Sequence, residues 1–302
     1  MPKIWQFSVI EFSKETWISG TILYSNKNQK HATKAIKNAK YVLKSYQKKT
    51  FANKQIKVVC NSNEFITKTD VHGYFSLLTT HKINKTPVVI NCDTLQEITT
   101  LQTYPTYFPD TSKRLAIISD IDETILHSHT KSAPKRIYTT LFKPAHKRGV
   151  VTFTKELFLA YRAKNPRYYY VSKSEANLFK IISEFLISND LPKGILLLTP
   201  YLNFKKLIKN QKELDFKKNT IEKIITLSPS KEFILVGDDS QKDVEIYTDV
   251  AKKFPKQISS IFIRQTKKTV NSEKLKNWQL LKNTGVNAHY FKKKESFNPK
   301  LL

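Results

Sequence analysis

From Arg114 onward, short apolar runs alternate with helical patterns, and this alternation constrains the fold of the chain more than any other feature. Each run is bounded by polar or turn residues, which is typical of buried strands. Strands that alternate with helices indicate a doubly wound α/β domain, with helices covering a mostly parallel sheet. The expected strands are Arg114–Ser119, Arg167–Ser172, Ile195–Leu198, Glu232–Gly237 and Ser259–Arg264, and the expected helices are Ser174–Asn189, Asn219–Leu227, Asp243–Lys252 and Ser272–Lys282.

Residues 1–110 have a different pattern, dominated by strand-like runs at Trp17–Tyr24, Ile56–Cys60 and Val88–Asn91. Gly73 stands at a turn before another strand, where a positive φ suits glycine. Apolar residues at helical spacing between Ala32 and Tyr46 predict one helix with lysines on its other face. That helix can pack on its own domain or lie on a lipid surface. We therefore expect a small β-sandwich-like accessory domain that carries one helix.

Pro105, Pro109 and the polar residues 110–113 indicate a linker between the two patterns. The predicted domains are residues 1–110, which form the β-rich accessory domain, and residues 111–302, which form the α/β domain with a basic C-terminal tail. Cys60 and Cys92 lack metal-ligand spacing and are expected to pack in the core.

The charge of the chain is strongly positive, with 52 Lys and Arg against 25 Asp and Glu, a net of +27. Such a field attracts anionic lipid, nucleic acid or polyanionic substrates. The alternative is a surface that uses lysine throughout as its solubilising residue. No apolar run approaches the roughly 18 residues that span a bilayer, and charges follow the start too soon for a signal peptide. We expect a cytoplasmic protein, at most peripheral at a membrane.

Two aspartates, Asp120 and Asp122, come directly after the first strand of the α/β series, and Thr124 follows. Open α/β sheets bind ligands at the carboxyl ends of their strands, so a loop there can turn both carboxylates toward one reacting centre. One aspartate can then attack an electrophile while the other handles protons beside a metal.

Three further polar signals follow in chain order at strand ends or helix starts. They are Ser172, then Lys217 or Lys218, then Gly237 with Asp238 and Asp243. The serine can hydrogen-bond an oxyanion, and the lysine, opening a helix, can neutralise a carboxylate and a transferred group. The glycine permits a tight turn, and the two acids suit a hard divalent cation. Together with the aspartate pair, this set fits attack on a phosphate monoester, whose uncatalysed hydrolysis is extremely slow.

These strings resemble the haloacid dehalogenase superfamily of aspartate-nucleophile phosphatases, and most closely the actin-patch-associated phosphatidate phosphatase family. The resemblance covers about residues 111–265. The similar strings are SDIDETI at Ser119–Ile125, YVSKSEANL at Tyr170–Leu178, FKKNTI at Phe216–Ile221 and GDDSQKDVEIY at Gly237–Tyr247. The resemblance implies a haloacid dehalogenase core. Only about 47 residues separate Thr124 from Ser172 and about 44 separate Ser172 from Lys217, so we expect a small cap and an open site that suits a bulky substrate.

For the first string, the resemblance implies that Asp120 is the nucleophile that forms an aspartyl-phosphate. It implies that Asp122 is the general acid and then the base, with its backbone carbonyl on the metal, and that Thr124 shapes the loop. Glu123 stands where the family has an aspartate, a change outside the catalytic side chains.

For the later strings, Ser172 would bind the phosphoryl group, and Lys217 fits the family spacing better than Lys218. Asp238 would bind Mg²⁺, and Asp243 would support the metal or the lysine. The implied metal set is Asp120, Asp122, Asp238 and Asp243. Glu175–Ala176 replace a Pro-Trp pair of the family, and Asp239–Ser240 replace Ser-Gly.

The expected function is therefore a Mg²⁺-dependent phosphatase of phosphatidate or a related anionic phospholipid. Two alternatives stay open. One is the same chemistry on another phosphomonoester, such as a nucleic-acid end, and the other is a non-catalytic lipid- or nucleic-acid-binding module. The sequence leaves the oligomeric state undetermined.

Overall fold

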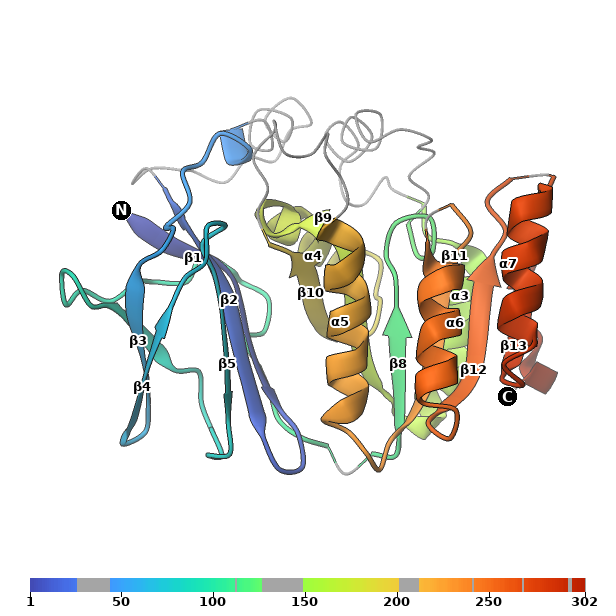
Figure 1. The fold of residues 1–302 in the computed structure, drawn as a ribbon, viewed down its shortest axis with the longest axis horizontal. Helices are drawn as coiled ribbons and strands as arrows, with labels where there is room; N and C mark the ends of the chain where they lie inside the picture. The colour runs from blue at the N-terminus through green and yellow to red at the C-terminus, as the bar shows by residue number, and fades with distance from the viewer. Residues whose placement is uncertain are drawn as a thin grey trace. The chain divides into compact units, whose positions relative to one another are not determined.

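The computed structural model describes residues 1–25, 44–111, 113–126, 149–200, 212–240, 242–267, 269–292 and 295–301 (Figure 1). The chain divides into two compact units. The first contains Met1–Thr111 and two later segments that begin at Ser174 and Leu198, and the second contains Ser112–Lys173, Phe185–Leu197 and Lys212–Leu302. Among the described residues, no helix is both long and apolar enough to span a bilayer.

The first unit contains two antiparallel sheets that share one core. The four-stranded sheet has the order β5-β2-β1-β7, with β1 Pro2–Glu11, β2 Thr16–Tyr24, β5 Tyr74–Thr79 and β7 Tyr107–Phe108; β7 joins it in parallel. The three-stranded sheet has the order β4-β3-β6, with β3 Gln55–Cys60, β4 Asn63–Lys68 and β6 Val88–Asn91. Buried residues of both sheets, such as Phe7, Ile22, Val58 and Val89, belong to one hydrophobic cluster.

The strands around Trp17, Val58 and Val89 are confirmed, and Cys60 is buried in the core as expected. The helix predicted between Ala32 and Tyr46 falls, except for its last residues, outside the described part of the chain. The sequence patterns did not predict β1 or β4, because charged and polar residues interrupt both runs.

A third sheet has six strands in the order β10-β9-β8-β11-β12-β13. Its strands are β8 Leu115–Ser119, β9 Arg167–Glu175, β10 Ile195–Thr199, β11 Glu232–Asp238, β12 Ile258–Arg264 and β13 Asn287–Phe291. The pairs from β9 through β8, β11 and β12 to β13 are all parallel. Ser119, the last residue of β8, is paired with both Tyr170 of β9 and Val236 of β11, and β9 continues beyond this level to Glu175.

The helices that alternate with these strands are α3 Thr152–Tyr161, α4 Phe179–Ser188, α5 Lys212–Thr226, α6 Asp243–Lys253 and α7 Ser272–Lys282, with short 3₁₀ turns at Arg162–Lys164, Ala176–Leu178 and Pro299–Leu301. In Figure 1, α5 and α6 lie in front of the strands and α3 behind them. Apolar side chains of α6, including Val250 and Ala251, are fully buried, as an amphipathic helix on a sheet requires.

Two helix predictions were wrong in their starts. The helix expected from Ser174 begins at Phe179, because β9 continues to Glu175 and a 3₁₀ turn follows. The helix expected from Asn219 begins at Lys212, so Lys217 lies inside α5 rather than at its opening. Charged residues early in α5 hide its apolar stripe, and local periodicity therefore understates its length.

Gly73 adopts φ +73°, which confirms the turn prediction. Its carbonyl accepts a hydrogen bond from the Ile22 amide at 2.8 Å, and a Cβ at this position would press into the Ile22 carbonyl. Gly285 also has a positive φ of 78°, but a Cβ there would meet open space.

We therefore predict that Gly73→Ala lowers the free energy of unfolding of the first unit by more than about 2 kcal/mol, because left-handed strain and overpacking add. Gly285→Ala should cost only about 1 kcal/mol, from backbone strain alone. Urea denaturation of both variants measures the difference. Equal losses would show that the contact with Ile22 contributes nothing.

Candidate functional site

The acidic residues predicted to act together meet at the carboxyl ends of two neighbouring strands. Asp120 comes directly after β8, and its amide donates to the Val236 carbonyl of β11 at 2.8 Å, which extends the ladder by one residue. Asp238 is the last residue of β11. Both carboxylates are almost completely buried. The parallel register of β8 and β11 therefore brings together acids that are more than a hundred residues apart in the chain.

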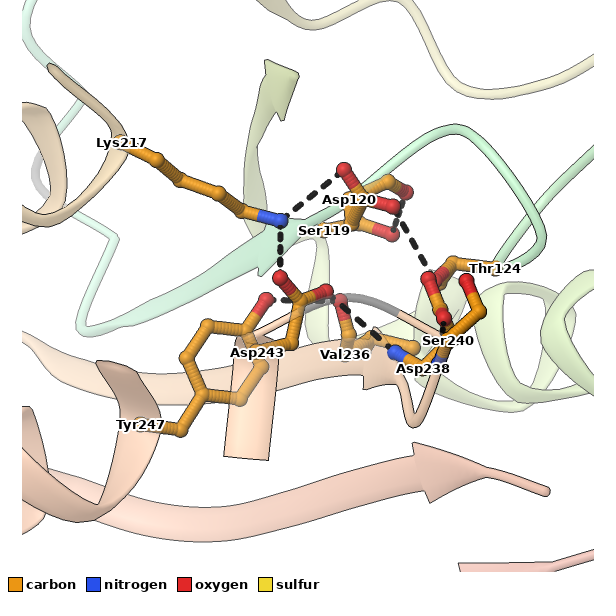
Figure 2. Close-up of polar contacts among 9 residues, drawn as sticks. All are labelled: Ser119, Asp120, Thr124, Lys217, Val236, Asp238, Ser240, Asp243 and Tyr247. Carbon is orange, nitrogen blue, oxygen red and sulfur yellow. Dashed lines mark hydrogen bonds and ion pairs between the residues drawn. The ribbon is translucent and has the colours of Figure 1, made fainter. Parts of the chain in front are cut away.

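A buried lysine connects two of the acids. The Lys217 ammonium lies 2.9 Å from the Asp120 carboxylate and 2.6 Å from that of Asp243, and all three side chains are at most 1 % exposed. Figure 2 shows Lys217 reaching from α5 to the pair. Lys218, the alternative in the sequence, instead pairs with Asp249 at 2.6 Å on the surface. The geometry thus places Lys217, and not Lys218, in the cluster.

The Thr124 side chain lies beside both Asp120 and Asp238. Its hydroxyl is 3.4 Å from an oxygen of Asp120 and 3.4 Å from an oxygen of Asp238. The loop around it is tightly closed, since the amides of Ile125 and Leu126 both donate to the Ile121 carbonyl, at 2.9 and 3.0 Å. Thr124 therefore stands at a fixed point beside both carboxylates.

The loop after β11 holds Asp238 and Asp243 against each other. The Asp238 amide donates to the Asp243 carboxylate at 3.3 Å, and the Ser240 amide donates to the Asp238 carboxylate at 2.5 Å (Figure 2). Gly237 was expected to permit a tight turn, but it is a strand residue without positive φ. A Cβ there would lie 2.7 Å from Asp243 and 2.8 Å from Tyr247, so this glycine is needed for close packing.

Burial and charge shift the ionisation of these groups. Burial raises the pKa of Asp120 to about 6, although the Lys217 ammonium opposes the rise. Burial also raises the pKa of Asp238 well above its usual range, and the negative charges of Asp243 and Asp120 add to this. For Lys217 burial alone would lower the pKa, but Asp120 and Asp243 outweigh it and raise the pKa well above its ordinary value. The cluster is thus crowded with negative charge.

The donor set suits a hard cation. One carboxylate oxygen from each of Asp120, Asp238 and Asp243 lies within 4.8 Å of the others, and all three residues are buried. Mg²⁺ takes oxygen ligands and is held through a few carboxylates with additional water or phosphate ligands. Burial raises the pKa of Asp238, and the negative charges of Asp243 and Asp120 add to the rise, so carboxylate charge is concentrated at this point. The three acids therefore fit a divalent cation.

The two remaining predicted residues, Asp122 and Ser172, are also buried. Asp122 is buried, and its negative charge helps to raise the pKa of Asp120. Ser172 is buried in β9, two residues beyond Tyr170, which pairs with Ser119. The structure therefore places Ser172 near the carboxyl end of the strand next to β8.

Lys173 was not among the residues predicted from the sequence. It is 9 % exposed; burial lowers its pKa, while Asp243, Asp120 and Asp238 act on it in the opposite direction. Its place directly after Ser172 was the available signal, but strand alternation predicts that neighbouring side chains point to opposite faces. Lys173 therefore adds a second cation to the surroundings of the acids.

Asp239, beside Asp238 in the chain, has a different environment. Its carboxylate accepts hydrogen bonds from the Thr266 amide at 2.9 Å and the Tyr290 hydroxyl at 2.5 Å, and pairs with Lys274 at 2.9 Å. Burial would raise its pKa, but these hydrogen bonds outweigh burial and lower it. Asp239 thus ties the end of β11 to β13 and α7 instead of joining the acidic cluster.

The chain is similar to known proteins of one family. Residues 115–265 match the family described as the catalytic domain of phosphatidate phosphatase APP1. Phosphatidate phosphatase APP1 of Saccharomyces cerevisiae is 32 % identical over 155 residues, which are 50 % of this chain and 26 % of that protein. An uncharacterized protein of Schizosaccharomyces pombe, C29B5.04c, is 26 % identical over 212 residues, 67 % of this chain and 34 % of that protein. The chain thus corresponds to about a third or less of the length of these relatives.

Two solved structures contain a chain that is similar to part of this chain. A chain in a structure of the Pnkp1/Rnl/Hen1 complex gives a TM-score of 0.35 with 18 % identity, covering 56 % of this chain and 51 % of that one. A chain in a structure of the Pnkp1/Rnl/Hen1 RNA repair complex gives 0.36 with 13 % identity, covering 63 % and 45 %.

The buried ion pairs of Lys217 lead to a stability prediction. Lys217→Met leaves Asp120 and Asp243 buried without their counter-charge, and removal of one partner from such a pair costs about 3–5 kcal/mol of unfolding free energy. Lys218→Met removes an exposed pair and should cost less than about 1 kcal/mol. Urea denaturation without added metal measures both values. Similar losses in the two variants would contradict the importance of the buried pairs.

Proposed function

Because this chain belongs to the catalytic-domain family of phosphatidate phosphatase APP1, we propose that it removes the phosphate group of phosphatidate or a related anionic phospholipid, with Mg²⁺ as cofactor. Membership of this family supports a phosphatase, a hydrolase of phosphoric monoesters. The choice of substrate is a proposal, since the matched relatives are much longer proteins. The observation that supports the chemistry most directly is the contact of Lys217 with both Asp120 and Asp243.

In the proposed reaction, Asp120 attacks the phosphorus of the monoester. A bond forms between its carboxylate oxygen and phosphorus, and the bond from phosphorus to the lipid oxygen breaks. Asp122 donates a proton to the leaving oxygen, so that the alcohol is released. Asp122 then takes a proton from a water that attacks the aspartyl-phosphate, which frees inorganic phosphate and restores Asp120.

The other residues of the site stabilise charge. Lys217, 2.9 Å from Asp120, would offset negative charge that builds up on the transferred phosphoryl group. Asp243 keeps this ammonium in place at 2.6 Å. Ser172 would donate a hydrogen bond to a phosphoryl oxygen. The Thr124 hydroxyl would help to hold the carboxylates of Asp120 and Asp238 in position.

Mg²⁺ would be held by Asp120 and Asp238, with the backbone carbonyl of Asp122 as a further ligand and Asp243 in support. It would supply positive charge that lets an anionic carboxylate approach an anionic phosphate. Burial raises the pKa of Asp238 and the nearby charges of Asp243 and Asp120 add to the rise, and this concentration of carboxylates supports a cation at this place. We also assign the α/β domain to the haloacid dehalogenase superfamily with a small cap. The order of the acids at the ends of β8 and β11 supports this assignment.

The net charge of +27 supports two substrate classes. Lysines near an anionic leaflet each add about 1 kcal/mol of attraction, which favours peripheral contact with a membrane that contains the lipid substrate. The same charge also favours a phosphorylated nucleic-acid end, which is the second candidate. Family membership supports the lipid as the first candidate.

The test is release of inorganic phosphate from phosphatidate vesicles, compared with oligonucleotides phosphorylated at the 5′ or 3′ end. We expect activity on phosphatidate with Mg²⁺ and its loss in EDTA. Activity on the oligonucleotides alone would remove the lipid substrate. Mg²⁺-dependent vesicle binding without turnover on any substrate would leave the chain a binding module.

The nucleophile is tested in the same assay. Asp120→Asn keeps the shape of the side chain but removes the attacking oxygen anion, so we expect turnover to fall by about 10³-fold or more. Asp249→Asn, which changes an exposed aspartate paired with Lys218, should retain turnover within about twofold of wild type. Full turnover in Asp120→Asn would exclude the covalent mechanism.

A further inference from the structure

Glu123 has an unusual backbone conformation within the proposed catalytic loop. It lies between Asp122 and Thr124 and adopts φ +59°, the left-handed region. Residues other than glycine, asparagine and aspartate enter this region at a cost, and they keep it only when the surroundings enforce it. Two backbone hydrogen bonds close the turn around it. The Glu123 amide donates to the Leu126 carbonyl at 2.9 Å, and the Leu126 amide donates to the Ile121 carbonyl at 3.0 Å.

Arg264 supplies a contact from outside the loop. It is the last residue of β12, its side chain is 2 % exposed, and β12 is separated from β8 by β11. Its Nη1 donates to the backbone carbonyl of Glu123 and lies 3.1 Å from the Glu123 carboxylate. One guanidinium therefore contacts both the main chain and the side chain of the residue in the left-handed conformation.

The next residue is also held from outside. The Thr154 hydroxyl, on α3, donates to the Thr124 carbonyl at 2.7 Å. The Thr124 side chain in turn lies 3.4 Å from both Asp120 and Asp238. The conformation of Glu123 thus decides the direction in which the chain leaves Asp122 and enters Thr124.

We propose that Arg264 is a positioning residue for the phosphatase reaction and that it acts through Glu123. The Arg264–Glu123 contact fixes the loop that carries Asp120, Asp122 and Thr124, without touching the substrate. This role rests on the proposed function of the same loop. Glu123, which stands where the family has an aspartate, would then support catalysis indirectly, by holding the loop and not by contacting the substrate. Displacement of a reacting group by about 1 Å can cost about 100-fold in rate, so such support has a measurable effect.

The experiment uses three variants of the full chain. Glu123→Gln keeps the size of the side chain but removes its charge. Arg264→Lys keeps the positive charge but loses the length and planar shape of the guanidinium. The matched control is Glu222→Gln, whose side chain is 16 % exposed, against 12 % for Glu123, and which pairs with Lys253 at 2.5 Å away from the loop.

Two readouts are measured for each variant. The first is kcat and KM for p-nitrophenyl phosphate with Mg²⁺. The second is hydrogen exchange at the amides of Glu123, Ile125 and Leu126, with amides of β8 and β11 as internal references. In Glu123→Gln and Arg264→Lys we expect kcat to fall about tenfold or more with KM within about twofold, and loop exchange to rise about tenfold. The control should match wild type in both readouts.

The inference is overturned if loop exchange and kcat in Glu123→Gln stay within twofold of the control. It is also overturned if exchange rises equally in β8 and β11, because the pair would then only stabilise the fold. If the wild-type chain releases no phosphate from any monoester, the proposed function fails. Hydrogen exchange then tests the contact separately, and unchanged exchange in the loop of the variants contradicts the positioning role.

Discussion

The rest of the site depends on the buried ion pairs that the Lys217 ammonium makes with Asp120 and Asp243. Carboxylates taken out of water are stable as anions only when a counter-charge or hydrogen bonds replace their hydration. Lys217 supplies that charge to Asp120 and Asp243 at once, at 2.9 and 2.6 Å. Even so, burial and the negative charges of Asp243 and Asp120 raise the pKa of Asp238, and the three acids form a group that could hold a cation.

The framework explains how these charges can be held so closely. Parallel strands β8 and β11 end at the same level, and the ladder continues through the Asp120 amide. Gly237 leaves room for Asp243 and Tyr247 where any side chain would push them away. Arg264 and Thr154 hold the loop carbonyls from two further elements. A site of this kind needs several separate segments to be in place before any one residue can act.

Much of the site could be predicted from the sequence because its residues follow local patterns. Asp120 and Asp238 come after apolar strands, which are recognisable by themselves, and Gly73 stands in a recognisable turn. The position of Lys217 within its helix was predicted wrongly, because charged residues obscure the apolar face at the start of α5. Lys173 was missed because its proximity to the acids depends on how β9 continues past Ser172.

The sequence by itself determined the kinds of chemical group available, their order along the chain and the strands that present them, since these depend on local periodicity and side-chain chemistry. Only the tertiary structure decided which lysine meets the acids, what Gly237 makes room for, and that Arg264 reaches Glu123. Those outcomes depend on strand register and helix packing, in one case between residues 141 positions apart in the chain. No local pattern encodes such distances, because they arise only when the sheet has assembled.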